Sequence, residues 1–162
     1  MLALNTIPLR IIGNTCIAYI HYISMMICFS SLIVGRTLIK ANLNKYEVFL
    51  IIIADIIYGL SSLLILISGI LRVLYFGRDS TFYTENPLFW WKVGVYLAIG
   101  GLSLYPTVTY ILWIIPLRRG ELPIISKQVI DRLCLILNIE LLAFILVPLL
   151  ATLLTQGIGL PM

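Results

Sequence analysis

NPLFWWKVGVYLAIGGLSLYPTVTYILWII, from Asn86 to Ile115, is the stretch that decides how this chain is organised. It is longer than the roughly 20 apolar residues that a membrane-spanning helix needs. Asn86 suits a helix N-cap, and Pro87 suits the first helical position because its missing N–H would be unpaired there anyway. Its polar side chains fall close to one helical face: Lys92, Tyr96, Ser103, Pro106, Thr107 and Tyr110. Lipid offers such a face no partners, so we expect it to pack against other helices or to line a cavity.

The rest of the chain has the same character. Of its 162 residues, 61% are hydrophobic and 11% are charged, which excludes an ordinary soluble domain. Four apolar segments are long enough to cross a bilayer, at about 11–38, 46–74, 87–115 and 129–155. They use most of the chain. The sequence therefore predicts an all-α fold, with residues 1–162 forming one integral membrane four-helix bundle.

The basic residues lie mostly around the predicted helix ends, and the net charge is +4. They form no patch interleaved with exposed aromatic residues, so we do not expect the protein to bind nucleic acid. The lipid bilayer is the partner that we expect. The links after the first and third helices, with their helix ends, hold Arg36, Lys40, Lys45, Arg118, Arg119, Lys127 and Arg132. The opposite side holds Arg10, Arg72, Arg78 and Lys92. This bias predicts both links on the cytoplasmic or stromal side and both termini on the outer, periplasmic or lumenal side.

Motifs for catalysis or metal binding give little guidance. The three cysteines, Cys16, Cys28 and Cys134, sit inside apolar segments without CxxC or CxxCH spacing, which favours free thiols over a metal site. There is no GxSxG motif, and the single histidine has no obvious serine or cysteine nucleophile beside it. These motifs therefore do not decide whether the protein is an enzyme.

His21, Arg72 and Lys92 form the most suggestive set of polar residues. They come from three predicted helices and should lie at similar depth in the outer half of the membrane. One hypothesis is a tetrapyrrole site such as haem b, with His21 as axial ligand and the two cations holding carboxylates. The alternative is that both cations extend to the headgroups and that His21 bonds across a helix interface.

In a second set of polar residues, Asp55 and Glu140 should lie nearer the middle of the membrane and Arg36 near its inner face. Buried carboxylates of this kind can carry protons or ions across membranes. With only two acids among four helices, a structural ion pair is the competing interpretation. The sequence predicts in either case that Asp55 and Glu140 are buried against protein.

The chain resembles a known family at NPLFWWK…GGLSLYPTVTYILW…LRRGELP, together with His21–Tyr22, Asp55, Tyr58–Gly59 and the stretch from Ser68 to Arg72. It is similar there to the four-helix bacterial membrane family called domain of unknown function 2214. This resemblance covers nearly the whole chain and implies a four-helix membrane fold, without an activity to transfer.

A more distant resemblance is to the copper-resistance D-type membrane domains and to the HemJ-type protoporphyrinogen oxidases. The HemJ-type resemblance implies a haem held through a histidine and a lysine, for which His21 and Lys92 would be the matching positions, although a second helix-borne histidine is absent here.

Three functional hypotheses follow from the sequence. The first is haem or tetrapyrrole binding with redox activity, and the second is a non-catalytic accessory or assembly subunit of a respiratory or photosynthetic membrane complex. The third is proton-coupled transport. The expected location is a plasma membrane or a thylakoid membrane, in a bacterium or a plastid.

Overall fold

The computed structural model describes residues 9–76 and 83–156. Its elements are α1 (Leu9–Leu38), α2 (Lys45–Leu71), a π-helical turn η1 (Arg72–Phe76), α4 (Pro87–Arg118) and α5 (Lys127–Thr155). Within these described ranges, four helices are long and apolar enough to cross a membrane. The predicted all-α fold with four spans is confirmed. The helices differ from the expected segments only at their ends, most visibly where the second span continues through η1.

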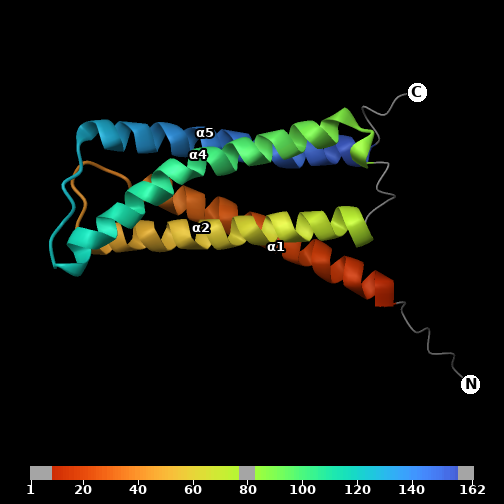
Figure 1. Ribbon diagram of the computed structural model, residues 1–162, viewed down its shortest axis with the longest axis horizontal. Coiled ribbons are helices and arrows are strands. Elements are labelled where there is room, and N and C mark those ends of the chain that lie inside the picture. The colour runs from red at the N-terminus through yellow and green to blue at the C-terminus, as the bar shows by residue number, and fades with distance from the viewer. Residues whose placement is uncertain (1–8, 77–82, 157–162) are drawn as a thin grey trace, which may run out of the picture.

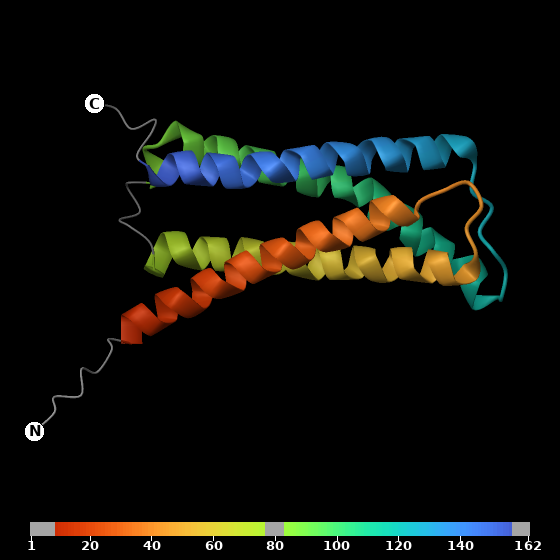
Figure 2. The same cartoon turned by 180° about the vertical axis from the view of Figure 1, so that it is seen from behind.

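The four long helices form two antiparallel pairs (Figure 1). α1 packs most extensively against α2, and α4 packs against α5. Smaller contacts between α1 and α5 and between α2 and α4 join the pairs into one bundle. α1 crosses α2, and its first turns diverge from the other helices (Figure 2). The bundle is therefore closed at one end and looser at the other.

The links 39–44 and 119–126 lie together at one end of the bundle, here called the link end (Figure 1). α1 begins and α5 ends at the opposite end, here called the terminal end, where η1 and the start of α4 also lie (Figure 1). This arrangement agrees with an even number of crossings. That the terminal end faces outward stays a prediction from the lysine and arginine distribution, in which Arg78 lies outside the described residues.

Side-chain caps begin three of the helices. Asn44 and Glu47 form a reciprocal capping box at the start of α2, with both bonds at 2.9 Å. The Asn86 side chain accepts from the Leu88 amide at 2.9 Å, and the Ser126 hydroxyl accepts from the Val129 amide at 3.4 Å. The cap that the sequence predicts at Asn86 is thus confirmed, and Asn86 and Ser126 mark the starts of α4 and α5.

The tightest apolar core lies toward the link end. Val48, Ile51 and Leu133 are completely buried there, in the first turns of α2 and α5. Trp113 of α4 is buried in the same cluster and packs against Tyr110, with the two rings tilted and their centroids 5.1 Å apart. Large apolar side chains cover the outer faces of all four helices, as a lipid environment requires. The packing therefore closes the bundle at the link end and leaves its polar residues toward the middle and the terminal end.

Candidate functional site

His21, Arg72 and Lys92 line one cavity at the terminal end, here called the terminal cavity. Its volume is about 210 Å³, and α1, η1, α4 and α5 all contribute to its wall. The structure thus brings together the three residues that the sequence places at similar depth. A second cavity of about 310 Å³, here called the lateral cavity, shares the His21 and Lys92 side chains. Its wall is otherwise almost wholly apolar, with Ile65, Leu66, Ile70, Val73, Leu74 and Leu97 among the lining residues.

A serine on α2 fixes the orientation of the His21 ring. His21 Nδ1 lies 2.9 Å from Ser68 Oγ. The single hydroxyl proton of Ser68 is directed at backbone carbonyls one turn earlier, those of Leu64 at 2.5 Å and Ile65 at 3.2 Å. With the hydroxyl proton on these carbonyls, Ser68 Oγ accepts from His21 Nδ1–H in the Nδ1-protonated tautomer of the ring. This tautomer leaves the lone pair on His21 Nε2, which is the nitrogen available to a ligand or metal.

Gly69 gives the His21 ring its space. A Cβ built at Gly69 would lie 3.5 Å from His21 Cε1, which is an ordinary van der Waals contact, so alanine would fit beside the ring. A side chain longer than alanine would meet it. The glycine, one residue after Ser68, therefore helps to set the place of His21 as Ser68 sets its orientation.

The two cations beside His21 lack carboxylate partners among residues 9–76 and 83–156. In that part of the chain the ion pair is between Lys40 and Glu47, at the link end. The Arg72 guanidinium lies over the Tyr22 ring, 5.5 Å from its centroid, at cation–π distance. Lys92 is partly buried and faces both cavities. Within the described residues, these partly buried cations are thus not neutralised by a carboxylate, and an anion could take that place.

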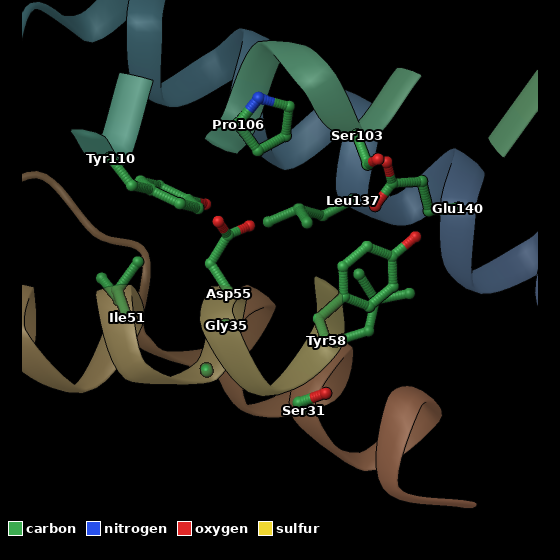
Figure 3. Close-up of a pocket in the computed structure, with 12 residues that line it drawn as sticks. Ser31, Gly35, Ile51, Asp55, Tyr58, Ser103, Pro106, Tyr110, Leu137 and Glu140 are labelled. Carbon is green, nitrogen blue, oxygen red and sulfur yellow. The ribbon is translucent and has the colours of Figure 1, made fainter. Parts of the chain in front are cut away.

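A second polar cavity, here called the central cavity, lies where all four helices meet (Figure 3). Its volume is about 20 Å³, and its polar lining comprises Ser31 of α1, Asp55 and Tyr58 of α2, Ser103 and Tyr110 of α4, and Glu140 of α5. Asp55 accepts a hydrogen bond from the Thr107 hydroxyl at 3.1 Å. Glu140 is 1% exposed, as the sequence predicts for a residue buried against protein. This cavity gathers the acids that the sequence places inside the spans.

Arg36 does not pair with either acid, so the ion pair expected for this set is wrong. Arg36 Nε donates to Asn138 Oδ1 at 2.7 Å, across the contact between α1 and α5. Arg36 lies near the end of α1 and so reaches α5 closer to the link end than Glu140. Arg36 meets Asn138 and not Glu140 because the two residues lie on different sides of α5. Glu140 points into the bundle, and Asn138, two residues earlier, lies on the outer side of the helix.

The residues that complete both sites are not obvious in the sequence. Ser68, Tyr22 and Asn138 each act as the partner of a residue singled out there. Ser68 lies on α2 one turn before Arg72, so its spacing is the signal that could have placed it beside the predicted site. Tyr22 directly follows His21, and nothing in its spacing distinguishes a partner of Arg72 from a lipid-facing residue.

The terminal and lateral cavities bring together residue types that could hold a tetrapyrrole. His21 could ligate iron through Nε2, Arg72 and Lys92 could hold carboxylates, and the wall of the lateral cavity is mostly apolar. Within the described residues, no three His, Cys, Asp or Glu side chains cluster in a way that could hold a bare metal ion. The cysteines are free thiols on α1 and α5.

Comparison with known proteins places the chain in a family. The family described as "Predicted membrane protein (DUF2214)" matches residues 14–159, from within α1 to beyond the end of α5. No curated protein and no solved structure matches the chain significantly. The match agrees with the multi-pass membrane fold described above. The chain belongs to this membrane protein family, domain of unknown function 2214.

Proposed function

We propose that this membrane protein binds haem or a related tetrapyrrole in the terminal and lateral cavities. The observation that carries the proposal is the His21–Ser68 hydrogen bond, which holds the ring through Nδ1 and leaves Nε2 for a ligand. A histidine that binds a metal through one ring nitrogen generally donates the N–H of its other ring nitrogen to a fixed acceptor. Bound haem would supply one-electron redox chemistry at its iron.

The chain's own residues would do the binding. Arg72 and Lys92 would each attract a carboxylate, since neither pairs with an acid in the described part of the chain. The apolar wall of the lateral cavity would cover the ring. Because residues on that wall such as Leu66 and Ile70 are partly exposed on the lipid face of α2, a hydrophobic ligand would enter from the bilayer.

Haem titration of the full chain in mild detergent tests this proposal. Wild-type protein should develop one Soret band at a stoichiometry of one haem per chain. His21→Ala should abolish that band, and Lys92→Ala should weaken or shift it. Arg72→Ala should lower occupancy without moving the band, because it would contact a carboxylate and not the iron. Lys127→Ala, at the link end, is the matched control and should behave as wild type. A wild-type protein that stays colourless after haem addition contradicts the proposal.

A second candidate, an accessory subunit of a larger membrane complex, is supported by the outer face of α4. Gly94, Ala98 and Gly101 are exposed there at helical spacing, and a Cβ at either glycine would meet nothing within 4 Å. Small residues in this pattern let a second helix approach closely. In native membranes, Ala98→Leu should release the protein from a stable larger complex, whereas Gly59→Leu, at an exposed glycine of α2, should not. Migration of the wild type as a free monomer excludes this role.

A further inference from the structure

Glu140 occupies an unusual position at the centre of the bundle. Its side chain is 1% exposed, and neither carboxyl oxygen has a hydrogen-bond partner among the described residues. The Tyr110 hydroxyl, on a side chain 3% exposed, is likewise unpartnered in that part of the chain. Burying a carboxylate without a partner is strongly unfavourable, most of all within a membrane. An apolar side chain would fill this place better, so stability does not explain Glu140.

The groups around Glu140 come from every helix of the bundle. α1 contributes the Cys28 thiol, which lies 3.8 Å from the Tyr58 carbonyl. α2 contributes Asp55 and Tyr58, and α4 contributes Ser103 and Tyr110. In Figure 3 the Glu140 carboxyl lies on the side of Ser103 and Tyr58, and Asp55 points toward the Tyr110 hydroxyl. None of the lining residues is a lysine, arginine or histidine. A negative charge on Glu140 would therefore find no cation here to balance it.

The central cavity has room for about one water molecule. Its volume of about 20 Å³ exceeds the ~10–15 Å³ that a water needs, and it offers several polar partners. A water there would bond to the hydroxyls and carboxyls that lack partners within the described chain. The cavity thus contains the elements of a short hydrogen-bonded chain around Glu140.

The series of polar groups around Glu140 continues toward the terminal end only. Tyr58 also lines the next small cavity, which contains Ser62 and Tyr96. The Tyr96 hydroxyl lies 2.9 Å from Ser62 Oγ and donates to the Ser62 carbonyl at 2.7 Å. Tyr96 in turn lines the lateral cavity together with His21. Toward the link end the way is closed by the completely buried side chains of the apolar core (Val48, Ile51 and Leu133).

We propose that Glu140 is a proton-binding site that exchanges protons with the terminal end through Tyr58, Tyr96 and the lateral cavity, and not with the link end. On uptake, a hydronium ion at the terminal end supplies the proton, intervening waters and hydroxyls pass it on, and an O–H bond forms on Glu140. Release reverses these steps, and no electron moves. The proton site itself uses none of His21, Arg72 or Lys92, although its route to the terminal end runs along the lateral cavity that a tetrapyrrole would occupy.

Infrared difference spectroscopy on the full chain in lipid vesicles tests the proton site. Between alkaline and acidic buffer, wild-type protein should gain a carboxyl C=O band typical of a protonated acid in apolar surroundings. Glu140→Gln should remove this band, while Glu121→Gln, in the exposed link after α4, should leave it. Absence of the band from the wild type, or its survival in Glu140→Gln, overturns the proposal. Loss of the band on adding sodium at constant pH also overturns it, since the site would then bind a metal cation.

The rate of deuterium exchange of the same band tests the route. Tyr96→Phe keeps the ring and removes the hydroxyl, so the Glu140 band should shift in heavy water at least tenfold more slowly than in the wild type. Tyr105→Phe, on α4 outside the series of cavities, should exchange at the wild-type rate. Equal exchange rates in Tyr96→Phe and the wild type contradict the route. Haem titration of Glu140→Gln should match the wild type, which separates failure here from failure of the tetrapyrrole proposal.

Discussion

Ser68 and Glu140 illustrate how single residues define the two polar sites. Ser68 completes its hydrogen bonding with His21 and two backbone carbonyls, so it orients a ring that other residues merely surround. Glu140 shows the opposite condition, a buried acid whose oxygens meet no donor in the described chain. At the residue scale, the His21 ring is held in one orientation, whereas the carboxyl oxygens of Glu140 can still accept or donate hydrogen bonds.

Replacing Ser68 by alanine should weaken haem binding. The change leaves the His21 Nδ1–H without its acceptor, and loss of such a partner typically lowers affinity about 10–100-fold. Titration of detergent-solubilised protein with haem, followed at the Soret band, measures the effect. Ser61→Ala is the control, because Ser61 is equally buried on α2 but does not contact His21. Unchanged affinity in Ser68→Ala would show that the ring needs no second partner.

Replacing Glu140 by methionine should stabilise the fold. Methionine has a similar volume and carries no unsatisfied oxygen, so the free energy of unfolding should rise by about 1–3 kcal/mol. Denaturant-induced unfolding in mixed micelles measures this change. Leu142→Met, on the exposed face of α5, is the control and should alter stability little. A clear loss of stability in Glu140→Met would mean that the carboxyl has a structural partner.

At the level of elements, α4 matches its sequence pattern most closely. The polar face predicted from Lys92 to Tyr110 points inward, because lipid favours only the apolar faces of a helix. The caps at Asn86 and Ser126 follow from local chemistry in the same way. The Arg36–Asn138 bond does not, because it joins residues 102 positions apart and depends on how α1 and α5 are rotated. Periodicity thus predicts which face is buried but not which side chains meet across it.

The link between α4 and α5 depends on one backbone conformation. Gly120 has φ +80°, a region that side chains other than glycine rarely adopt, and its carbonyl accepts a hydrogen bond from Lys45. Gly120→Ala should therefore cost about 1–2 kcal/mol of stability, measured by thermal unfolding in detergent. Gly59→Ala is the control, since Gly59 is helical with open space around it, and it should be neutral or stabilising by up to about 1 kcal/mol. Equal effects at both positions would contradict this account.

At the scale of the whole molecule, the bundle is asymmetric along its length. The link end is closed by a tight apolar core, and the terminal end contains the larger cavities together with His21, Arg72 and Lys92. The number of spans follows from hydropathy and length alone. The positions of the cavities do not, because their walls combine side chains of α1, α2, η1, α4 and α5 that lie far apart in the sequence. The two ends therefore differ in packing and in the polar residues that they contain.

Single-cysteine labelling in intact cells tests the predicted orientation. In a variant whose three native cysteines are replaced, Glu85→Cys should react with an impermeant thiol reagent from outside. Glu121→Cys should react only after permeabilisation, because positive residues hold the links inside. Both positions are exposed, so accessibility within the protein does not distinguish them. The reverse pattern would place the terminal end, and its cavities, on the cytoplasmic side.

Native mass spectrometry of the full chain, released from detergent without added haem, tests the central claim most directly. It weighs whatever molecule the protein retains and does not assume that this molecule is coloured. The account predicts that the wild type retains one tetrapyrrole per chain and that His21→Ala does not, while Lys127→Ala matches the wild type. Retention of only phospholipid or of nothing by the wild type, expressed in cells that make haem, would contradict the assignment of these cavities.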